Sequence, residues 1–479
     1  MFIGAGLWLY MVGMYFEVYD ATNQDVPYSH ITGHVEEKYV QETLRGFKEN
    51  LTEFFKGRDS LSSNIAFVVF MSHQCKMIFN QSSIINSLKE EAFDIAVIDA
   101  SNPCTFLFME KIGKPFIAFF PTYSANAGQV GIPSPLSYVP FLGTRLPDQM
   151  DFFQRVQNVL GFIVYHMVVE EKISSMFNDV IEENFPEGPR PSLSELYKKA
   201  ELWIYNSDFA IDFPRPLLPH VIYVGGLLSE APMHVSPELE DFISESGEAG
   251  FIIVALGSIV TSYPVIEFVQ EMNGGLAKIS QKVIWKYQQS DWPKEVKLAP
   301  NVKLMDWIPQ NDLLGHPKVR LLVTHGGMNS LQQAMYHGVP VLGIPLFADQ
   351  HDNLVRVKAK KFGTFIQPDR VKAELLADTI KHIIDDKSYK ATAMHMSLIL
   401  RSQPFPPDQQ ILRWVEHIIQ VGGASHLHPS SYQQPWYQQY LLDVILFLLL
   451  CVTVTCYLTV KVLKILITLL CSVRKEKTH

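Results

Sequence analysis

Residues 323–350, VTHGGMNSLQQAMYHGVPVLGIPLFADQ, contain the turn that decides the fold. The apolar run RLLVT stops at HGGMNS, the helix formers LQQAMYH follow, and Gly338 before Val-Pro ends the helix. A strand that ends directly before a helix predicts an open α/β sheet, in which ligands bind at the carboxyl ends of the strands. Gly326 and Gly327 let a phosphate approach the backbone, and the start of the helix supplies free N–H groups and a favourable dipole. The stretch therefore predicts an anion site on a βα turn.

The same turn also admits a purely structural interpretation. Asn329 and Ser330 add side-chain donors for a ligand. Ser330 and Gln333, however, fit a capping box, in which both side chains satisfy the amides at a helix end. The stretch matches neither a Walker loop nor a GxGxxG fingerprint. The residues around the turn must therefore decide between a ligand site and a helix cap.

Strand-like and helix-like segments alternate in both halves of the chain, which predicts an α/β fold of two Rossmann-like domains. Prolines crowd the chain at 201–226, so we expect a first domain over residues 1–225, a linker over 226–248 and a second domain over 249–425. Buried strands are expected at 16–20, 94–100 and 114–120 in the first domain, and at 251–258, 282–288, 302–308, 320–326 and 341–346 in the second. Amphipathic helices are expected at 35–55 and 266–279.

The composition argues against two kinds of site. The 479 residues carry a formal charge of -9 with no basic block, which excludes the electrostatic footprint of a nucleic-acid binder. Of the five cysteines, only Cys75 and Cys104 lie outside the C-terminal apolar tail, so at most one disulfide is expected before that tail. No CxxC pair and no His/Cys ladder at zinc spacing is present, so we expect no metal site and no bound cofactor.

The C-terminus carries a membrane signal. Residues 440–460 form an apolar run that only Asp443 interrupts, long enough for one transmembrane helix, and a buried core helix is the alternative. Trp436, Tyr437 and Tyr440 mark one interface of the run. A basic tail over 461–479 follows it, so the positive-inside rule places the tail in the cytosol and the body on the other side. The final KEKTH resembles the dilysine retrieval signal of endoplasmic reticulum membrane proteins, and a plain basic tail is the alternative.

Further features concern the N-terminal part of the chain. The sequons at Asn50 and Asn80 predict N-glycosylation of a lumenal body. Residues 1–16 are apolar but lack the basic start and the clear cleavage site of a signal peptide, so a signal, an anchor and a buried strand all remain open.

Polar and aromatic residues follow several of the expected strands of the second domain. Trp307 and Gln310 follow one strand, Asp349 and Gln350 follow another, and Ser258 ends a third. An aromatic ring can stack on a base, and a carboxylate beside an amide can hydrogen-bond sugar hydroxyls. Together with the glycine-rich turn, these residues predict a nucleotide-sugar site.

The stretch WIPQNDLLGHPKVRLLVTHGGMNSLQQAMYHGVPVLGIPLFADQHDN resembles the signature of the UDP-glucuronosyltransferases, membrane-bound glycosyltransferases of the endoplasmic reticulum. The stretches AELWIYNSDFAIDFPRPLLP and GGASHLHPSSYQQPWYQQYLLDV are most similar to the third subfamily, whose members use donors other than glucuronate. The resemblance implies a GT-B fold of two Rossmann-like domains and no metal. It also implies a protein that crosses the membrane once, with its body in the lumen. It also implies transfer with inversion from a UDP-sugar co-substrate to a small lipophilic acceptor, and homo- or hetero-oligomers with family members.

The resemblance also assigns roles to individual residues. Trp307 stacks on uracil and Gln310 contacts the uridine, while Asp349 and Gln350 bind the sugar hydroxyls. The diphosphate is held by a further set: Ser258, His325, Gly327, Asn329 and Ser330. Gln333 stands where the family has a glutamate that binds the ribose hydroxyls. Because a charged acceptor is worth roughly 1.5–3 kcal/mol against about 1 kcal/mol for a neutral one, we expect donor affinity to be about tenfold weaker.

The catalytic part departs further from the family. The family base is a histidine after the first strand of the N-terminal domain, oriented by an aspartate that matches Asp99. From the resemblance we expect this sequence to begin after that histidine turn. His30 does not follow a strand directly and is a poor substitute, and Asp99 alone could simply cap a helix. Three functions follow: a UDP-glycosyltransferase, a truncated and impaired form that binds donor or pairs with full-length family members, and a soluble epimerase. The absence of GxGxxG and YxxxK disfavours the epimerase.

Overall fold

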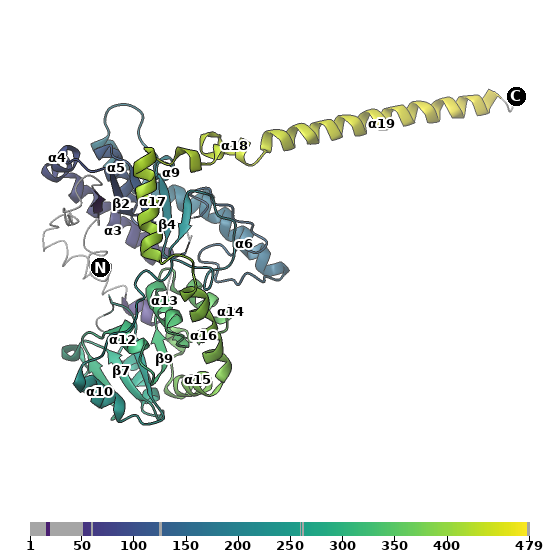
Figure 1. Ribbon diagram of the computed structural model, residues 1–479. Helices are drawn as coiled ribbons and strands as arrows, with labels where there is room; N and C mark the ends of the chain where they lie inside the picture. Colours follow the sequence, from purple (N-terminus) through teal and green to yellow (C-terminus); the bar gives the residue numbers. More distant parts are fainter. Residues whose placement is uncertain are drawn as a thin grey trace. The chain divides into compact units, whose positions relative to one another are not determined.

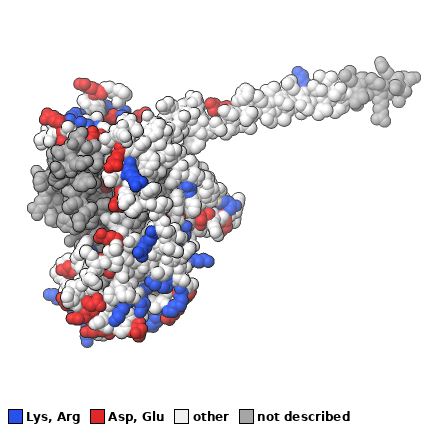
Figure 2. Space-filling model, in the orientation of Figure 1, with Lys and Arg blue, Asp and Glu red and all other residues white. Residues whose placement is uncertain are grey.

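The computed structural model describes residues 16–19, 51–58, 61–123, 127–258, 260 and 263–476. The chain forms two compact units, Met1–Leu427 and His428–His479, each described by itself below. His30, Asn50, residues 1–15 and most of the expected helix over 35–55 lie outside the described residues. On the visible face of the molecule acidic and basic side chains are interspersed (Figure 2), consistent with the lack of a basic block in the sequence.

The first half of unit Met1–Leu427 contains a five-stranded sheet in the order β1-β2-β3-β4-β5. Its strand β1 runs antiparallel to β2, and the other neighbours are parallel. The strands are β1 (Phe16–Tyr19), β2 (Ile95–Asp99), β3 (Phe116–Phe120), β4 (Leu202–Tyr205) and β5 (Val221–Tyr223). The first three confirm the expected strands, whereas β4 and β5 lie inside the proline-rich stretch whose strands the sequence did not predict.

Helices cover both faces of this sheet (Figure 1). The helices of this half are α3 (Leu61–Phe79), α4 (Ser82–Glu90), α5 (Pro103–Ile112), α6 (Phe152–Val164), the π-helix η1 (Tyr165–Val169), α7 (Glu170–Ser175), α8 (Asn178–Asn184) and α9 (Leu193–Tyr197). Side chains of α3, α4, α5, α8 and α9 form one core with the sheet. Helix α17 (Pro407–Val421) covers the other face, where Val415 and Ile418 pack against β2, β3, β4 and β5.

The second half contains a six-stranded, wholly parallel sheet in the order β11-β10-β9-β6-β7-β8. The strands are β6 (Phe251–Ala255), β7 (Lys282–Lys286), β8 (Val302–Met305), β9 (Val319–Thr324), β10 (Val341–Gly343) and β11 (Gly363–Phe365). Five of them confirm the expected strands, and β11 was not expected. The strand order reverses between β6 and β9, which is the place where doubly wound sheets bind nucleotides.

Helices also cover both faces of the second sheet. They are α10 (Pro237–Ser244), α11 (Ile266–Leu276), α12 (Gln310–Leu314), α13 (Met328–Tyr336), α14 (Gln350–Ala359), α15 (Ala373–Asp385) and α16 (Lys387–Arg401), with short 3-10 turns at Gln289–Asp291 and Pro368–Arg370. One core includes α11 and α15, and the other includes α10, α13, α14 and α16. Helix α10 thus occupies the expected linker, and α17, which the expected boundary at 425 placed in the second domain, packs on the first sheet.

A short N-terminal segment joins the two halves. In residues 51–58, Leu51, Phe54 and Phe55 are buried in the core of the second sheet rather than the first. The ring of Phe55 lies 4.8 Å from that of Phe268, and the ring of Phe54 lies 5.3 Å from that of Phe347. The segment therefore reaches the loop that precedes α14.

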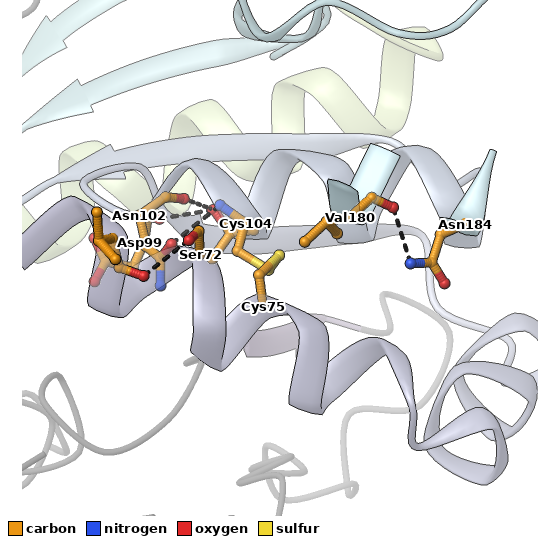
Figure 3. Close-up of a disulfide and its surroundings, with 9 residues drawn as sticks. Ser72, Cys75, Asp99, Asn102, Cys104, Val180 and Asn184 are labelled. Carbon is orange, nitrogen blue, oxygen red and sulfur yellow. Dashed lines mark hydrogen bonds between the residues drawn. A yellow bond between two sulfur atoms is a disulfide. The ribbon is translucent and has the colours of Figure 1, made fainter. Parts of the chain in front are cut away.

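A disulfide links Cys75 on α3 to Cys104 on α5 (Figure 3). The two cysteines that lie outside the C-terminal apolar tail therefore form the one disulfide that the sequence allowed before that tail. Both cysteines are fully buried in the first core. The bond closes a loop between residues 29 apart in sequence and fixes the start of α5 against α3.

Among its described residues, unit His428–His479 contains a 3-10 helix, the short helix α18 (Trp436–Gln439) and the long helix α19 (Leu442–Glu476). The 3-10 helices η4 (Ser425–Leu427) and η5 (Ser430–Gln433) lie on either side of the unit boundary. Residues Leu442–Thr468 of α19 are long and apolar enough to cross a membrane, and none of the most apolar window is buried. This span runs past the expected end at 460, because the helix continues through Lys461 and Lys464. The lack of burial argues against the alternative of a core helix.

Candidate active site

The glycine-rich turn lies where the strand order of the second sheet reverses. His325 follows β9, and Gly257 and Ser258 follow its neighbour β6. Helix α13 begins at Met328, its N-cap is Gly327, and no side chain caps it. The capping-box interpretation is therefore wrong, because Ser330 lies inside the helix instead of at its start. The first amides of α13 remain free for a ligand, as the anion-site prediction requires.

His325 is enclosed by glycines. A Cβ atom at Gly257 would lie 2.9 Å from Nε2 of His325, and one at Gly327 would lie 2.7 Å from the same atom. Only glycine therefore fits on either side of the ring. Burial, with a smaller contribution from Lys286, lowers the pKa of His325 to about 4. The imidazole is consequently neutral near pH 7 and can donate one hydrogen bond but no charge.

The positive charge in the site comes from Lys286, which the sequence analysis missed. Lys286 ends β7, is largely buried, and donates to the backbone oxygens of Gly257 at 2.8 Å and Ser258 at 3.4 Å. Burial lowers its pKa to about 8. The hydroxyl of Ser258 is also buried and makes no hydrogen bond among the described residues. The available sequence signal was a lysine directly after the apolar run VIW of the strand KVIWK.

The expected nucleoside residues lie at one end of this group. The side chain of Trp307 is 63% exposed, and Nζ of Lys286 lies 5.5 Å from the centre of its ring. Gln310 donates to the Ser330 hydroxyl at 3.1 Å and to Oε1 of Gln333 at 2.7 Å. The structure thus brings together the three residues expected to contact the nucleoside: Trp307, Gln310 and Gln333.

Gln333 is also tied to the segment between the two sheets. Its Nε2 donates to the backbone oxygen of Leu228 at 3.0 Å. A glutamate at this position could accept from Gln310 but could not donate to Leu228. The amide therefore satisfies a carbonyl that a carboxylate would leave without this donor.

Two expected ligand residues contact side chains that follow strands of the first sheet. Oδ1 of Asn329 accepts from Asn206, which follows β4, at 2.6 Å. Oδ2 of Asp349 accepts from Thr122, which follows β3, at 2.6 Å, and from Asn353 at 2.7 Å. These bonds show that the carboxyl ends of the first sheet face those of the second. Burial raises the pKa of Asp349.

Gln350 fixes the turn that carries Asp349. Its Oε1 accepts from the amides of Leu346 at 2.8 Å and Phe347 at 3.0 Å. This oxygen therefore holds the end of the loop between β10 and α14. The preceding Ala348 has a φ of 55°, a left-handed conformation that these bonds help to hold.

A buried charge cluster, which the sequence did not predict, joins the two halves beside Asp349. Nε of Arg356 on α14 lies 2.9 Å from Oδ1 of Asp212, and both side chains are almost fully buried. The guanidinium carbon lies 3.6 Å from the ring centre of Tyr123. Asp352 accepts from two amides of the 143–145 loop at 2.8 and 3.0 Å. Burial raises the pKa of Asp352, so the arginine and these amides are what stabilise its charge.

Asp99 ends β2 in the first half. Its Oδ1 accepts from the amide of Ser101 at 2.9 Å and from the Ser101 hydroxyl at 2.7 Å. Asn102 rather than Asp99 caps α5, since Asn102 accepts from the amide of Cys104 (Figure 3). The helix-cap alternative for Asp99 is therefore wrong. Burial raises the pKa of Asp99 to about 6.

Asn80, the described glycosylation candidate, lies directly after α3 and is exposed. Among the residues that the structure describes, no group of three or more His, Cys, Asp or Glu side chains could hold a metal ion.

The arrangement can therefore bind an anion next to a flat ring system. Four kinds of group meet where the strand order of the second sheet reverses. They are the free amides at the start of α13, the neutral His325, the Ser258 hydroxyl, which has no partner among the described residues, and the buried Lys286. An exposed tryptophan and an amide pair lie beside it. Groups from the first sheet close the other side.

Comparisons with known proteins agree with this geometry. A model of the UDP-glucoronosyl and UDP-glucosyl transferase family matches residues 15–477. UDP-glucuronosyltransferase 3A1 of Xenopus laevis is 58% identical over 460 residues, covering 96% of this chain and 88% of that protein. UDP-glucuronosyltransferase 3A2 of Homo sapiens is 46% identical over 458 residues, covering 96% and 87%.

Solved structures support the fold. The glycotransferase of kitacinnamycin matches with a TM-score of 0.54 at 17% identity, covering 74% of this chain and 82% of that one. CalG4, the calicheamicin glycosyltransferase, matches with a TM-score of 0.52 at 17% identity, covering 75% and 81%. These similarities confirm the expected GT-B fold of parallel α/β sheets. By its family match and its relatives, the chain belongs to the UDP-glucoronosyl and UDP-glucosyl transferase family.

Proposed function

We propose that the protein transfers a hexosyl group from a UDP-sugar to a hydroxyl of a small lipophilic acceptor, with inversion at the anomeric carbon. The observation that carries the proposal is the cluster at the switch point of the second sheet. There His325, Lys286 and the uncapped start of α13 surround one point, and Trp307 is exposed beside it. This set suits a uracil base followed by a diphosphate.

The chemistry follows from the charges of these groups. The acceptor oxygen attacks C1 of the sugar, the bond from C1 to the diphosphate oxygen breaks, and UDP leaves with the bonding electron pair. Lys286, the amides of α13 and the neutral His325 stabilise the negative charge that develops on the leaving diphosphate. The family resemblance assigns to Asp99 the orientation of the base that takes the proton of the acceptor hydroxyl, and no such base contacts Asp99 among the described residues.

The proposed location is the endoplasmic reticulum membrane, with a lumenal body and a cytosolic tail. Two observations support it. The Cys75–Cys104 disulfide suits an oxidising compartment, and the exposed Asn80 side chain is free to accept a glycan. Removal of N-glycans by endoglycosidase H tests this, with Asn80→Gln and Asn50→Gln as matched variants. A shift in mobility that is absent from the double variant supports lumenal exposure, and no shift in the wild type contradicts it.

A second function, donor binding without transfer, is favoured by one specific observation. The Asp99 carboxylate accepts from the amide and the hydroxyl of Ser101, and no histidine among the residues that the structure describes hydrogen-bonds to it. Such a form would bind UDP-sugar or pair with full-length family members.

One experiment separates the two functions. The full chain is expressed in microsomes and assayed for UDP release with several UDP-sugars and a phenolic or steroid acceptor, beside UDP binding. We expect acceptor-dependent UDP release, and Asp99→Asn should lower it by about 10²–10⁴ while UDP binding is retained. Retained binding with no release in the wild type would overturn the transferase and leave the binding protein. Loss of binding in the wild type would overturn both.

A further inference from the structure

One face of α14 carries a row of polar side chains that contact the first half of the chain. The members of the row are Asp349, Asp352, Arg356 and Lys360. They follow one another at intervals of three or four residues, which places them on one side of a helix. The helix itself belongs to the second half, because Leu354 and Val357 are buried in a core of the second sheet. The row therefore lies between the two halves.

Three segments of the first half bind this row. The Thr122 hydroxyl, directly after β3, donates to Asp349 at 2.6 Å. The amides of Gly143 and Arg145 donate to Asp352 at 2.8 and 3.0 Å. The third segment connects β4 to β5 and binds the last two members of the row. Segments far apart in the sequence thus meet on a single helix face.

Arg356 and Asp212 form a buried ion pair within this contact. Nε of Arg356 lies 2.9 Å from Oδ1 of Asp212, and the two side chains are 5% and 3% exposed. Oδ2 of Asp212 accepts from the Tyr223 hydroxyl at 2.9 Å, and the guanidinium lies over the rings of Tyr123 and Phe213. Each partner is therefore held in one orientation, and the pair sets the distance between α14 and the segment from β4 to β5.

Helix α14 has a separate anchor in the second half. A Cβ atom at Gly326 would lie 2.7 Å from Cγ of Leu354, so the helix packs directly against the glycine-rich turn. Asn353 donates to the carbonyl of Gly326 at 3.0 Å. None of these contacts involves the first half. Loss of the ion pair should therefore displace the first half and leave α14 in its place beside the turn.

Glycosyl transfer requires a defined placement of the two halves. In the proposed function Asp349 of the second half binds the sugar, and the base is oriented by Asp99, which ends β2 in the first half. The reacting atoms must lie about 3–3.5 Å apart for attack, and a misplacement of about 1 Å can lower the rate about 10²-fold. The contacts that fix the first half on α14 therefore affect the rate of transfer directly.

We propose that Asp212 and Arg356 are positioning residues for glycosyl transfer. Neither contacts the reacting atoms. Their ion pair places the first half, which carries the acceptor, against the sugar bound at the start of α14. The proposal rests on the proposed function and adds to it the pair that aligns the acceptor with the donor sugar.

The test compares two reactions of the donor sugar in the purified full chain. In both, the bond from C1 to the diphosphate oxygen breaks, UDP leaves with the electron pair, and the attacking hydroxyl loses its proton. Transfer to 4-methylumbelliferone requires an aligned acceptor, whereas hydrolysis requires only a water molecule at C1. The donors are UDP-glucose, UDP-N-acetylglucosamine and UDP-glucuronate. The measured quantity is the ratio of glycoside formed to free sugar released, beside the Kd for UDP.

The main variant combines Arg356→Met with Asp212→Asn, so that neither charge is left buried alone. We expect its transfer to fall by about 10- to 100-fold relative to hydrolysis, with the Kd for UDP unchanged. Asp208→Asn is the matched control. Asp208 lies in the same segment from β4 to β5 but accepts from Gln403 and from the Ala210 amide instead of from α14. We expect the wild-type ratio for this control.

A merely structural role would give a different result. Loss of folded protein lowers transfer and hydrolysis by the same factor and leaves their ratio unchanged. An unchanged ratio in the double variant would therefore overturn the proposal. So would a ratio that recovers from Arg356→Met to the double variant in step with the unfolding free energy. A wild type that transfers no sugar would instead overturn the proposed function itself.

A second measurement does not depend on activity. The amides of Gly143 and Arg145 bind Asp352 of α14, so their hydrogen exchange reports on the contact between the halves. We expect faster exchange of the peptide that contains residues 143–145 in the double variant than in the wild type or in Asp208→Asn. Unchanged exchange in the double variant would show that the ion pair does not hold the first half on α14, and would overturn the proposal.

Discussion

The replacement of Lys286 by methionine tests the electrostatics of the donor site. Methionine keeps much of the length and the apolar stem of the side chain and removes only the ammonium group. In the wild type this group donates to two carbonyls and lies beside Trp307 and His325, whose imidazole is neutral because burial lowers its pKa to about 4. We therefore expect Lys286→Met to remove the side-chain charge that faces the diphosphate.

The magnitude follows from the strength of charge-assisted hydrogen bonds. A hydrogen bond to a charged group contributes about 1.5–3 kcal/mol, and each 1.4 kcal/mol corresponds to a factor of about ten in affinity. Lys286→Met should thus weaken UDP binding by about ten- to 150-fold. Lys282→Met is the control, because Lys282 begins the same strand and pairs with Glu245 at 2.6 Å. We expect no change in UDP affinity for that variant.

The pH dependence gives a second, independent readout. The pKa of Lys286 is lowered to about 8, so the ammonium is present below pH 8 and is lost as the pH rises through that value. UDP affinity of the wild type should therefore fall above pH 8 towards that of Lys286→Met, whose affinity should not show this fall. Lys286→Arg, which stays charged, should remove the fall as well. Isothermal titration calorimetry across this range measures all three, and wild-type affinity in Lys286→Met would refute the reasoning.

Three further outcomes are expected. Gln333→Glu should bind UDP up to about tenfold more tightly, because a carboxylate is a stronger acceptor for the ribose hydroxyls than an amide. It should also lose about 1 kcal/mol of unfolding free energy, because the carbonyl of Leu228 loses its donor. Calorimetry and thermal unfolding check this, and unchanged UDP affinity would speak against the ribose role. Arg356→Met should lower the unfolding free energy, measured by denaturant, by about 3–5 kcal/mol, because it leaves the buried Asp212 carboxylate without its arginine. Adding Asp212→Asn should restore part of the loss, and no recovery would contradict the pairing. Cys75→Ala with Cys104→Ala should cost about 3–4 kcal/mol, from the entropy of a loop whose ends are 29 residues apart; a smaller loss in the same denaturant assay would argue for compensating structure in the unfolded state.

Most strands could be predicted because each is a short buried run with its own turn signals. The exceptions have physical reasons. Strand β11 is only three residues long, and prolines surround β4 and β5, so no local pattern separates them from a linker. Helix α17 has an ordinary amphipathic pattern, and that pattern says that one face is buried but not against which sheet.

The candidate site divides in the same way. Trp307, Gln310, His325 and Ser330 could be found from sequence because each lies in a motif near the end of a strand. Lys286 was missed, because a lysine at a strand end is usually solvated, and only the tertiary structure shows that it is buried.

The sequence by itself determined the alternation of elements, the glycine turn, the apolar C-terminal span and the family to which these motifs belong. Each of these depends on residues that are close together along the chain. Only the tertiary structure decided the uncapped start of α13, the burial of Lys286 and the contacts between the two sheets. Thr122 and Asp349 are 227 residues apart along the chain, yet their side chains lie 2.6 Å apart. Such contacts form between elements whose local patterns specify burial but not a partner, so the partner is set by the packing of the whole fold.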